Sequence, residues 1–140
     1  MGKRIDVLID TDVILDLLLD RPVYSEESAK LLTLCERGEV NGYVTPIIFA
    51  NVFYFLKKVA GSEQAVLKSL ALLNILEVIP VTKSNIKEAL FSPMADKENA
   101  MQSMAAYSHG SIHAIVTRNV KDYKKSPLQA VLPGDVIKMR

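Results

Sequence analysis

The chain has 140 residues, of which 49% are hydrophobic and 24% charged, and its formal net charge is +1. This length and composition suit one compact domain, residues 1–140, and exclude disordered and fibrous classes. The near-neutral charge favours no class of partner, so phosphate binding would need a local basic patch. No apolar run is long enough to span a membrane, and the N-terminus is a poor signal peptide. We therefore expect a soluble, cytoplasmic protein with no membrane partner.

The first half of the chain alternates strand and helix patterns. "IDVLID" (5–10) is a nearly continuous apolar run, which is typical of a strand buried in a parallel sheet. Helical spacing follows in 12–20 and again in 24–39, where Ser25 is the expected cap and the helix stops near Gly38. The lone cysteine, Cys35, lies among leucines and is expected in the core. "NGYVT" (41–45) predicts a second strand.

The second half continues the alternation. Thr45 before Pro46 predicts a helix start, and that helix should end at Gly61, after which Ser62 caps the next one. A strand at 77–81, a helix at 84–91, a helix between Asp96 and Gly110, a strand at 112–117 and an edge strand at 128–132 follow. This order predicts an α/β sandwich with a central, mainly parallel β-sheet flanked by helices.

Polar residues follow the ends of the predicted strands. They are Asp10 after the first strand, Thr117, Arg118, Asn119 and Asp122 after the strand at 112–117, and Asp96, Glu98 and Asn99 at the start of the preceding helix. In an open parallel sheet, ligands bind outside the carboxyl ends of the strands, so we expect these acids to meet at one edge. Clustered carboxylates favour Mg²⁺ or Mn²⁺, which can activate water for phosphodiester hydrolysis.

Five segments carry a resemblance to a known family. They are "VLIDTDVILDLLLDRP", "GYVTPIIFANVFYFLKK", "LLNILEVIPVT", "DKENAMQSMAAYSHGSIHAIVTRNVKDYKKSP" and "VLPGDVIKM". In this order they resemble the PIN-domain family over nearly the whole chain. The resemblance implies a PIN-like fold and a Mg²⁺- or Mn²⁺-dependent ribonuclease acting on RNA, often the toxin of a VapC-type toxin–antitoxin pair with a cognate antitoxin protein. It also implies a homodimer, and the very apolar helices at 46–60 and 63–76 agree with that expectation.

The family's acids map onto one carboxylate and three amides. Asp10 matches the first acid, whereas Asn51, Asn99 and Asn119 fall on the other acidic positions. One branch of the family has Asp-x-Glu-Asp-Ala followed by Thr-Arg-Asn-x-Lys-Asp, and "DKENA" and "TRNVKD" resemble it. In that branch Glu98 and Asp122 supply the missing charge, and only Asn99 remains a departure.

The resemblance assigns a role to each candidate residue. Asp10, Glu98 and Asp122 are the expected metal ligands and catalytic groups, assisted in catalysis by Asn99 and Asn119. The expected substrate-binding residues are Arg118, Lys121 and Lys124, and the supporting residues are Asp12, Asn51, Asp96 and Thr117. Simpler alternatives remain open: acids near helix N-termini also serve as caps, Asn51 also fits a structural hydrogen bond, and a basic run is often a solvated loop.

Two other functions compete with a ribonuclease. "LIDTDV" also fits the opening of a haloacid-dehalogenase-like phosphatase, with Asp10 as nucleophile and Asp12 as acid/base. Against it, the helical pattern begins directly after the strand, and the sequence has no convincing late pair of aspartates. The third alternative is a PIN-like fold that has lost activity and binds RNA or a protein, which the amides at positions 51, 99 and 119 favour.

Overall fold

The computed structural model describes residues 4–139, in which a five-stranded sheet forms the centre. The strands are β1 (Ile5–Ile9), β2 (Val40–Val44), β3 (Glu77–Val78), β4 (Ala114–Val116) and β5 (Ala130–Val131). Their order is β3-β2-β1-β4-β5, and every neighbouring pair is parallel. The predicted parallel sheet is confirmed, with the segment at 128–132 contributing an edge strand.

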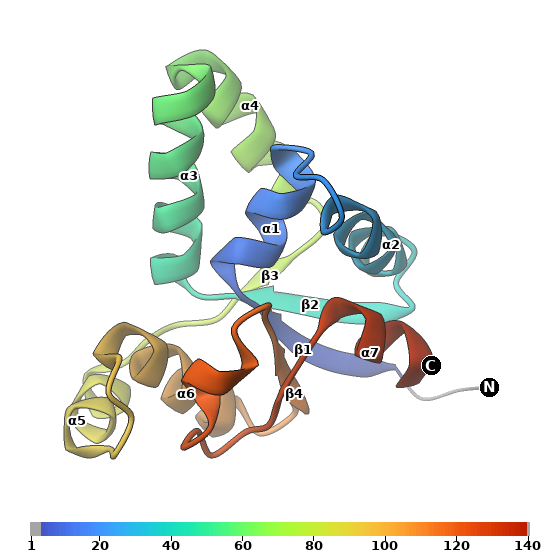
Figure 1. Ribbon diagram of the computed structural model, residues 1–140. Coiled ribbons are helices and arrows are strands. Elements are labelled where there is room, and N and C mark those ends of the chain that lie inside the picture. Colours follow the sequence, from blue (N-terminus) through green and yellow to red (C-terminus); the bar gives the residue numbers. More distant parts are fainter. Residues whose placement is uncertain (1–3, 140) are drawn as a thin grey trace.

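Helices cover both faces of this sheet. They are α1 (Thr11–Leu18), α2 (Ser25–Glu36), α3 (Pro46–Ala60), α4 (Ser62–Leu73), α5 (Lys83–Phe91), α6 (Lys97–His109) and α7 (Pro133–Met139), with a 3₁₀ turn, η1 (Val120–Tyr123). The first four helices lie on one side, where α3 and α4 form a projecting hairpin, and α5 and α6 lie on the other (Figure 1). The α/β sandwich is thus confirmed, whereas η1 and α7 are elements that the sequence analysis missed. In the described part of the chain, no helix is both long enough and apolar enough to cross a membrane.

Local sequence signals fix several helix ends. The hydroxyl of Thr45 caps α3 by accepting from the Ile48 amide at 3.1 Å, directly before Pro46 at the first helical position. Asp96 caps α6 in the same way, and Gly110 ends that helix with φ +91°, a left-handed conformation that favours glycine. These predicted caps are confirmed.

Two predicted serine caps are wrong. Ser25 and Ser62 are the first helical residues of α2 and α4, and the preceding residues, Tyr24 and Gly61, make no side-chain cap hydrogen bond. A serine close to a helix start resembles a cap in sequence, but one residue of displacement carries its hydroxyl past the position that can reach the free amides.

The sheet packs closely on α2 through one glycine. A Cβ atom at Gly42 in β2 would lie 2.6 Å from Leu76 Cδ2 and 2.9 Å from Cys35 Sγ, so no side chain fits there. Cys35 lies in the core as expected, and burial raises the pKa of its thiol to about 12. This dense packing holds the carboxyl ends of β1 and β2 in fixed positions below the site.

Candidate active site at the carboxyl end of the sheet

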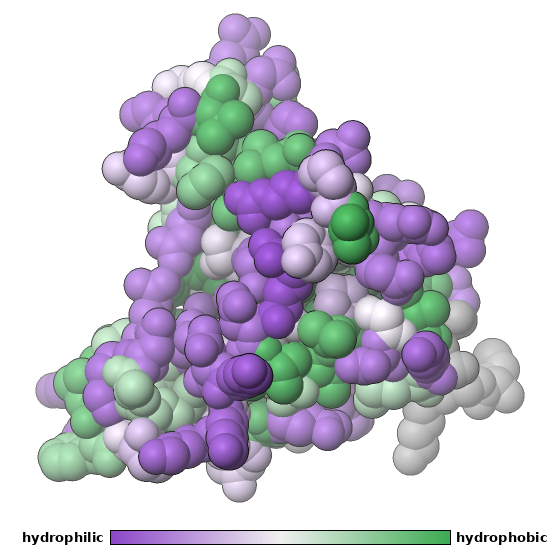
Figure 2. Space-filling view, in the orientation of Figure 1, coloured by the Kyte–Doolittle hydropathy of each residue, from purple (hydrophilic) through white to green (hydrophobic). Residues whose placement is uncertain are grey.

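One hollow of about 380 Å³ opens beyond the carboxyl ends of β1 and β4, and we call it the acidic hollow. Its lining residues are Asp10, Thr11, Asp12, Leu15, Arg21, Asn51, Phe55, Asp96, Glu98, Asn99, Gln102, Asn119 and Asp122. Figure 2 shows hydrophilic side chains gathered down the middle of this face, beside the α3–α4 hairpin. The structure therefore brings together all five predicted carboxylates and all three amides, from segments more than 100 residues apart.

Asp10 lies at the junction between β1 and α1. Its Oδ1 accepts from the Thr11 amide at 2.8 Å, and its Oδ2 accepts from the hydroxyls of Thr117 at 3.1 Å and Tyr123 at 3.0 Å. Asp10 is therefore the cap of α1 as well as a site residue. Burial raises the pKa of the Asp10 carboxyl, because the three hydrogen bonds compensate only part of the loss of water.

Asp12 accepts hydrogen bonds from the loop that follows β4. Its Oδ2 accepts from the Arg118 amide at 3.2 Å and from Asn119 Nδ2 at 3.0 Å, and it lies 3.4 Å from the Thr117 hydroxyl. Its Oδ1 is buried and has no hydrogen-bond partner among residues 4–139. Burial and the neighbouring Asp10 raise the pKa of the Asp12 carboxyl to about 6. Asp12 thus has a structural role through one oxygen, while its other oxygen is buried without a partner in a residue that lines the hollow.

Tyr123 is a site residue that sequence reasoning missed. Its buried hydroxyl lies 3.0 Å from Asp10 Oδ2 and 3.1 Å from Asn99 Oδ1, so one hydrogen is shared between the two oxygens. Burial, followed by the charge of Asp10, raises the pKa of the Tyr123 phenol, which therefore stays a donor. The only sequence signal was its position directly after Asp122 in "VKDY".

The first turn of α6 faces α3 across the hollow. Asn51 Nδ2 donates to Glu98 Oε1 at 2.6 Å and joins the two helices. Asp96 caps α6 through the Asn99 amide at 3.0 Å and also lines the hollow. Asn51 is therefore both a structural link and a lining residue, and so the two interpretations of this residue do not exclude each other.

The three basic residues expected to bind substrate do not line the hollow. Arg118 turns out of the hollow and donates to the fully buried carboxylate of Asp16, with Nε at 2.6 Å and the second nitrogen at 3.1 Å. Lys121 and Lys124 are exposed on and after η1 and do not line the hollow. Arg21, which the sequence analysis did not consider, lines it instead, 3.3 Å from Asp16 and with its guanidinium 5.6 Å from the centre of the Phe55 ring.

The chemistry of the lining fits a hard divalent cation. Carboxylate and amide oxygens are the ligands that Mg²⁺ and Mn²⁺ prefer, and the unpaired Oδ1 of Asp12 is a buried oxygen ready to accept one. No group of three or more His, Cys, Asp or Glu side chains within residues 4–139 is arranged to hold a metal ion by itself. The hollow therefore fits an ion held by one or two carboxylates plus water, which is the usual coordination of Mg²⁺.

Solved structures with the same architecture include toxin–antitoxin complexes and a VapC toxin. The chain is similar to a protein in the VapBC2 complex of Rickettsia felis bound to a promoter DNA fragment (17% identity, TM-score 0.71, covering 91% of this chain and 98% of that one). It is also similar to a protein of a toxin–antitoxin complex from Klebsiella pneumoniae (21%, 0.68, 91% and 97%). A third is the sarcin–ricin loop cleaving VapC toxin of Mycobacterium tuberculosis (13%, 0.61, 78% and 86%). At these identities the likeness shows the fold.

Sequence comparison gives the family. No curated protein matches the chain significantly. The phosphatase alternative fails on the fold, because α1 begins at Thr11, directly after Asp10, and leaves no room for a flap. The model of the PIN domain matches residues 6–121, and the chain belongs to the PIN-domain family.

Proposed function

We propose that this protein is a Mg²⁺- or Mn²⁺-dependent ribonuclease that hydrolyses RNA phosphodiesters in the acidic hollow. One observation carries the proposal: five carboxylates line a single hollow at the carboxyl end of the sheet, and burial raises the pKa of Asp10 and of Asp12. A divalent cation would relieve this unfavourable burial of charge. The fold of a toxin that cleaves the sarcin–ricin loop supports the same reaction class.

The half-buried acids would hold the ion. Asp10 and Asp12 are the partly buried acids of the lining, and Oδ1 of Asp12 has no hydrogen-bond partner among residues 4–139, whereas Glu98 and Asp122 are exposed. A bound Mg²⁺ or Mn²⁺ supplies an activated water and neutralises charge on the phosphodiester. The carboxylates accept the proton of the attacking water, because an amide oxygen brings no charge and is not a base.

The amides orient rather than ionise. Asn99 receives the shared hydrogen of Tyr123, and Asn119 donates to Asp12, so both side chains are fixed at the edge of the hollow. Asn51 fixes Glu98 by the bond at 2.6 Å. Arg21 adds a cation to the lining, and Lys121 and Lys124 are proposed to contact phosphates farther along the strand.

The biological role that we propose is that of a VapC-type toxin with a cognate antitoxin protein. The support is the fold shared with the toxin–antitoxin complexes of Rickettsia felis and Klebsiella pneumoniae.

We also propose a homodimer, because the α3–α4 hairpin exposes many apolar side chains. These are Tyr54, Phe55, Val59, Val66, Leu67, Leu70 and Leu73. A monomer at high protein concentration in light scattering would contradict the proposed homodimer.

A second candidate function is a PIN-like module that binds RNA or protein without cleaving. The amides Asn51, Asn99 and Asn119 in the hollow favour it, because each replaces a carboxylate that the family resemblance leads one to expect. Binding without cleavage would then leave the metal dispensable. The two candidates therefore differ in a single measurable property.

Cleavage of a mixed pool of structured RNAs tests the function. The parent should cleave in Mn²⁺ and not in EDTA, and Asp10→Asn should be inactive at the same protein concentration. Lys68→Met on α4 is the control, because it removes a charge from a residue that does not line the hollow. A parent that binds the pool but leaves it intact in Mn²⁺ would support the binding module instead.

A further inference from the structure

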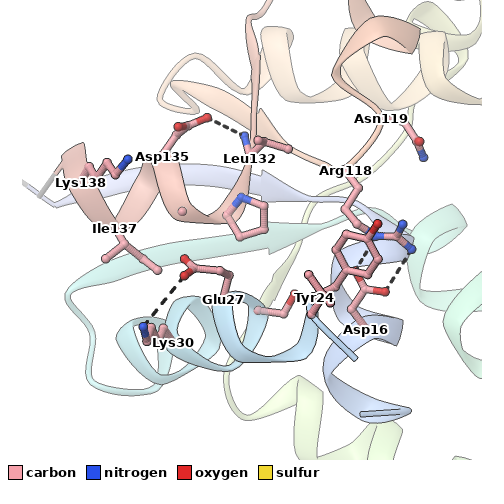
Figure 3. A pocket seen from close by; sticks show the side chains of 14 residues that line it. Asp16, Tyr24, Glu27, Lys30, Arg118, Asn119, Leu132, Asp135, Ile137 and Lys138 are labelled. Carbon is pink, nitrogen blue, oxygen red and sulfur yellow. Dashed lines mark hydrogen bonds and ion pairs between the residues drawn. The ribbon is translucent and has the colours of Figure 1, made fainter. Parts of the chain in front are cut away.

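A second cavity, of about 720 Å³, lies beside the acidic hollow, and we call it the Tyr24 pocket. It is formed by α2, the loop before it and the segment from β5 into α7 (Figure 3). Asn119 lines both the pocket and the hollow, so the two adjoin at this residue. A strand seated in the hollow therefore has an adjoining space for one of its neighbouring groups.

An aromatic ring is held in this pocket by an ion pair whose carboxylate is buried. The guanidinium carbon of Arg118 lies 4.1 Å from the centre of the Tyr24 ring, and Asp16 holds that guanidinium by two hydrogen bonds. Figure 3 shows the Tyr24 ring beside Arg118, with dashed lines joining Arg118 to Asp16. Tyr24 is nevertheless 46% exposed. One part of the ring is thus fixed by the cation while nearly half of its surface remains available for stacking.

Strain marks the loop that carries Tyr24. Among residues 4–139, only Asp20 and Val23 combine a side chain with positive φ, at +47° and +75°, and both lie between α1 and α2. Val23 is β-branched and 85% exposed, so neither its own preference nor burial explains this conformation. Backbone strain of this kind concentrates at ligand-binding sites, where the surrounding contacts maintain it.

The walls of the pocket offer both acceptors and apolar surface. Ser28 lines the pocket, and its buried hydroxyl has no hydrogen-bond partner among residues 4–139. The carboxylate of Glu27 lies over Gly134, where an added Cβ would be only 3.0 Å from Oε2. Leu132 and Ile137 supply the apolar side. A flat ligand with hydrogen-bond donors on one edge fits this combination.

We infer that the Tyr24 pocket binds a nucleobase of the RNA strand whose phosphodiester occupies the acidic hollow. This inference rests on the proposed function and assigns part of its specificity. The base stacks on Tyr24, and its edge donates to Glu27 and Ser28. Because Glu27 is an acceptor, bases with an exocyclic amino group bind better than uracil, which lacks one.

Binding of short RNAs in EDTA tests the inference without requiring cleavage. Tyr24→Ala should weaken the affinity of an amino-rich oligonucleotide by about 5- to 150-fold, the usual loss for one stacked base. Tyr24→Phe should keep the parent affinity because it retains the ring. Tyr107→Ala, which removes a similarly exposed tyrosine from α6, outside the pocket, should have no effect. Circular dichroism and thermal melts check that each variant is folded.

Two further experiments test which edge of the base is recognised and separate this inference from the proposed function. Glu27→Gln should reduce the preference for amino-bearing bases over oligouridine. Tyr24-dependent binding without any cleavage in Mn²⁺ would uphold the pocket and reject the ribonuclease. Mn²⁺-dependent cleavage with equal RNA affinity and base preference in parent and Tyr24→Ala would uphold the ribonuclease and overturn the pocket. Absence of RNA binding in EDTA would also overturn it and favour a protein side chain as the occupant.

Discussion

The hydroxyl of Tyr123 donates to Oδ2 of Asp10 at 3.0 Å and joins residues 113 positions apart in the chain. The same hydrogen lies within reach of Asn99, so the phenol links η1 to both β1 and α6. This contact stabilises the charged form of Asp10 inside a partly buried site. Tyr123 is therefore a positioning residue for the first carboxylate of the site.

Tyr123→Phe removes only this hydroxyl. We expect the free energy of unfolding to fall by about 1–3 kcal/mol in EDTA, because a buried hydrogen bond to a charged group is lost. Urea unfolding measures the change. Tyr107→Phe, which removes the hydroxyl of an exposed tyrosine on α6, is the control. Equal stability of Tyr123→Phe and the parent would show that the bond contributes nothing.

Asp16 is the buried anchor of two cations. It has no exposed surface, and its carboxylate binds Arg118 and Arg21. Asp16→Asn leaves both cations without their charged partner, so we expect a loss of about 3–5 kcal/mol in urea unfolding. Glu26→Gln, which breaks the exposed pair with Lys30, should change stability by less than about 1 kcal/mol. A loss no greater in Asp16→Asn than in Glu26→Gln would contradict the anchoring role.

Asp12 makes the metal-free protein sensitive to pH. Its pKa is about 6 in the folded protein against 3.8 for an unperturbed aspartate carboxyl, so between these values the folded state binds more protons than the unfolded state. The free energy of unfolding contributed by Asp12 therefore falls as pH rises from about 4 to about 6. Urea unfolding in EDTA should show this decline in the parent and a smaller one in Asp12→Asn. An identical pH slope in both proteins would contradict the assignment.

Asn99→Asp changes the charge of the hollow by one unit. The Tyr123 hydroxyl, which now donates between Asp10 and Asn99, would then lie between two carboxylates. Repulsion should lower stability in EDTA, whereas the concentration of Mn²⁺ for half-maximal RNA cleavage should fall. Asn74→Asp, on the exposed end of α4, controls for the added charge. A half-maximal Mn²⁺ concentration that does not fall would show that Glu98 and Asp122 already suffice.

Short-range signals made much of the fold predictable. The apolar run ending at Asp10 and the Thr45-Pro46 start are local patterns, and each is confirmed where it was expected. The gathering of acids at one edge followed from the rule for parallel sheets. The short helix α7 was not predicted, because seven residues are too few to show a clear helical periodicity.

Contacts between distant residues were the part that the sequence did not show. The pairing of Arg118 with Asp16 depends on which way a long side chain turns, and a basic run near a site gives no indication of it. The role of Tyr123 likewise depends on the packing of η1 against β1 and α6. Such contacts join residues that only the finished fold places side by side.

Binding of Mn²⁺ to the acidic hollow is the central claim, and thermal unfolding across a Mn²⁺ titration tests it most directly. The parent should gain about 2.7 kcal/mol when free Mn²⁺ reaches a hundred times the dissociation constant, with a corresponding rise in Tm. Asp10→Asn should lose most of this gain, and Lys68→Met should keep it. A Tm of the parent that does not change across millimolar Mn²⁺ would contradict the metal site.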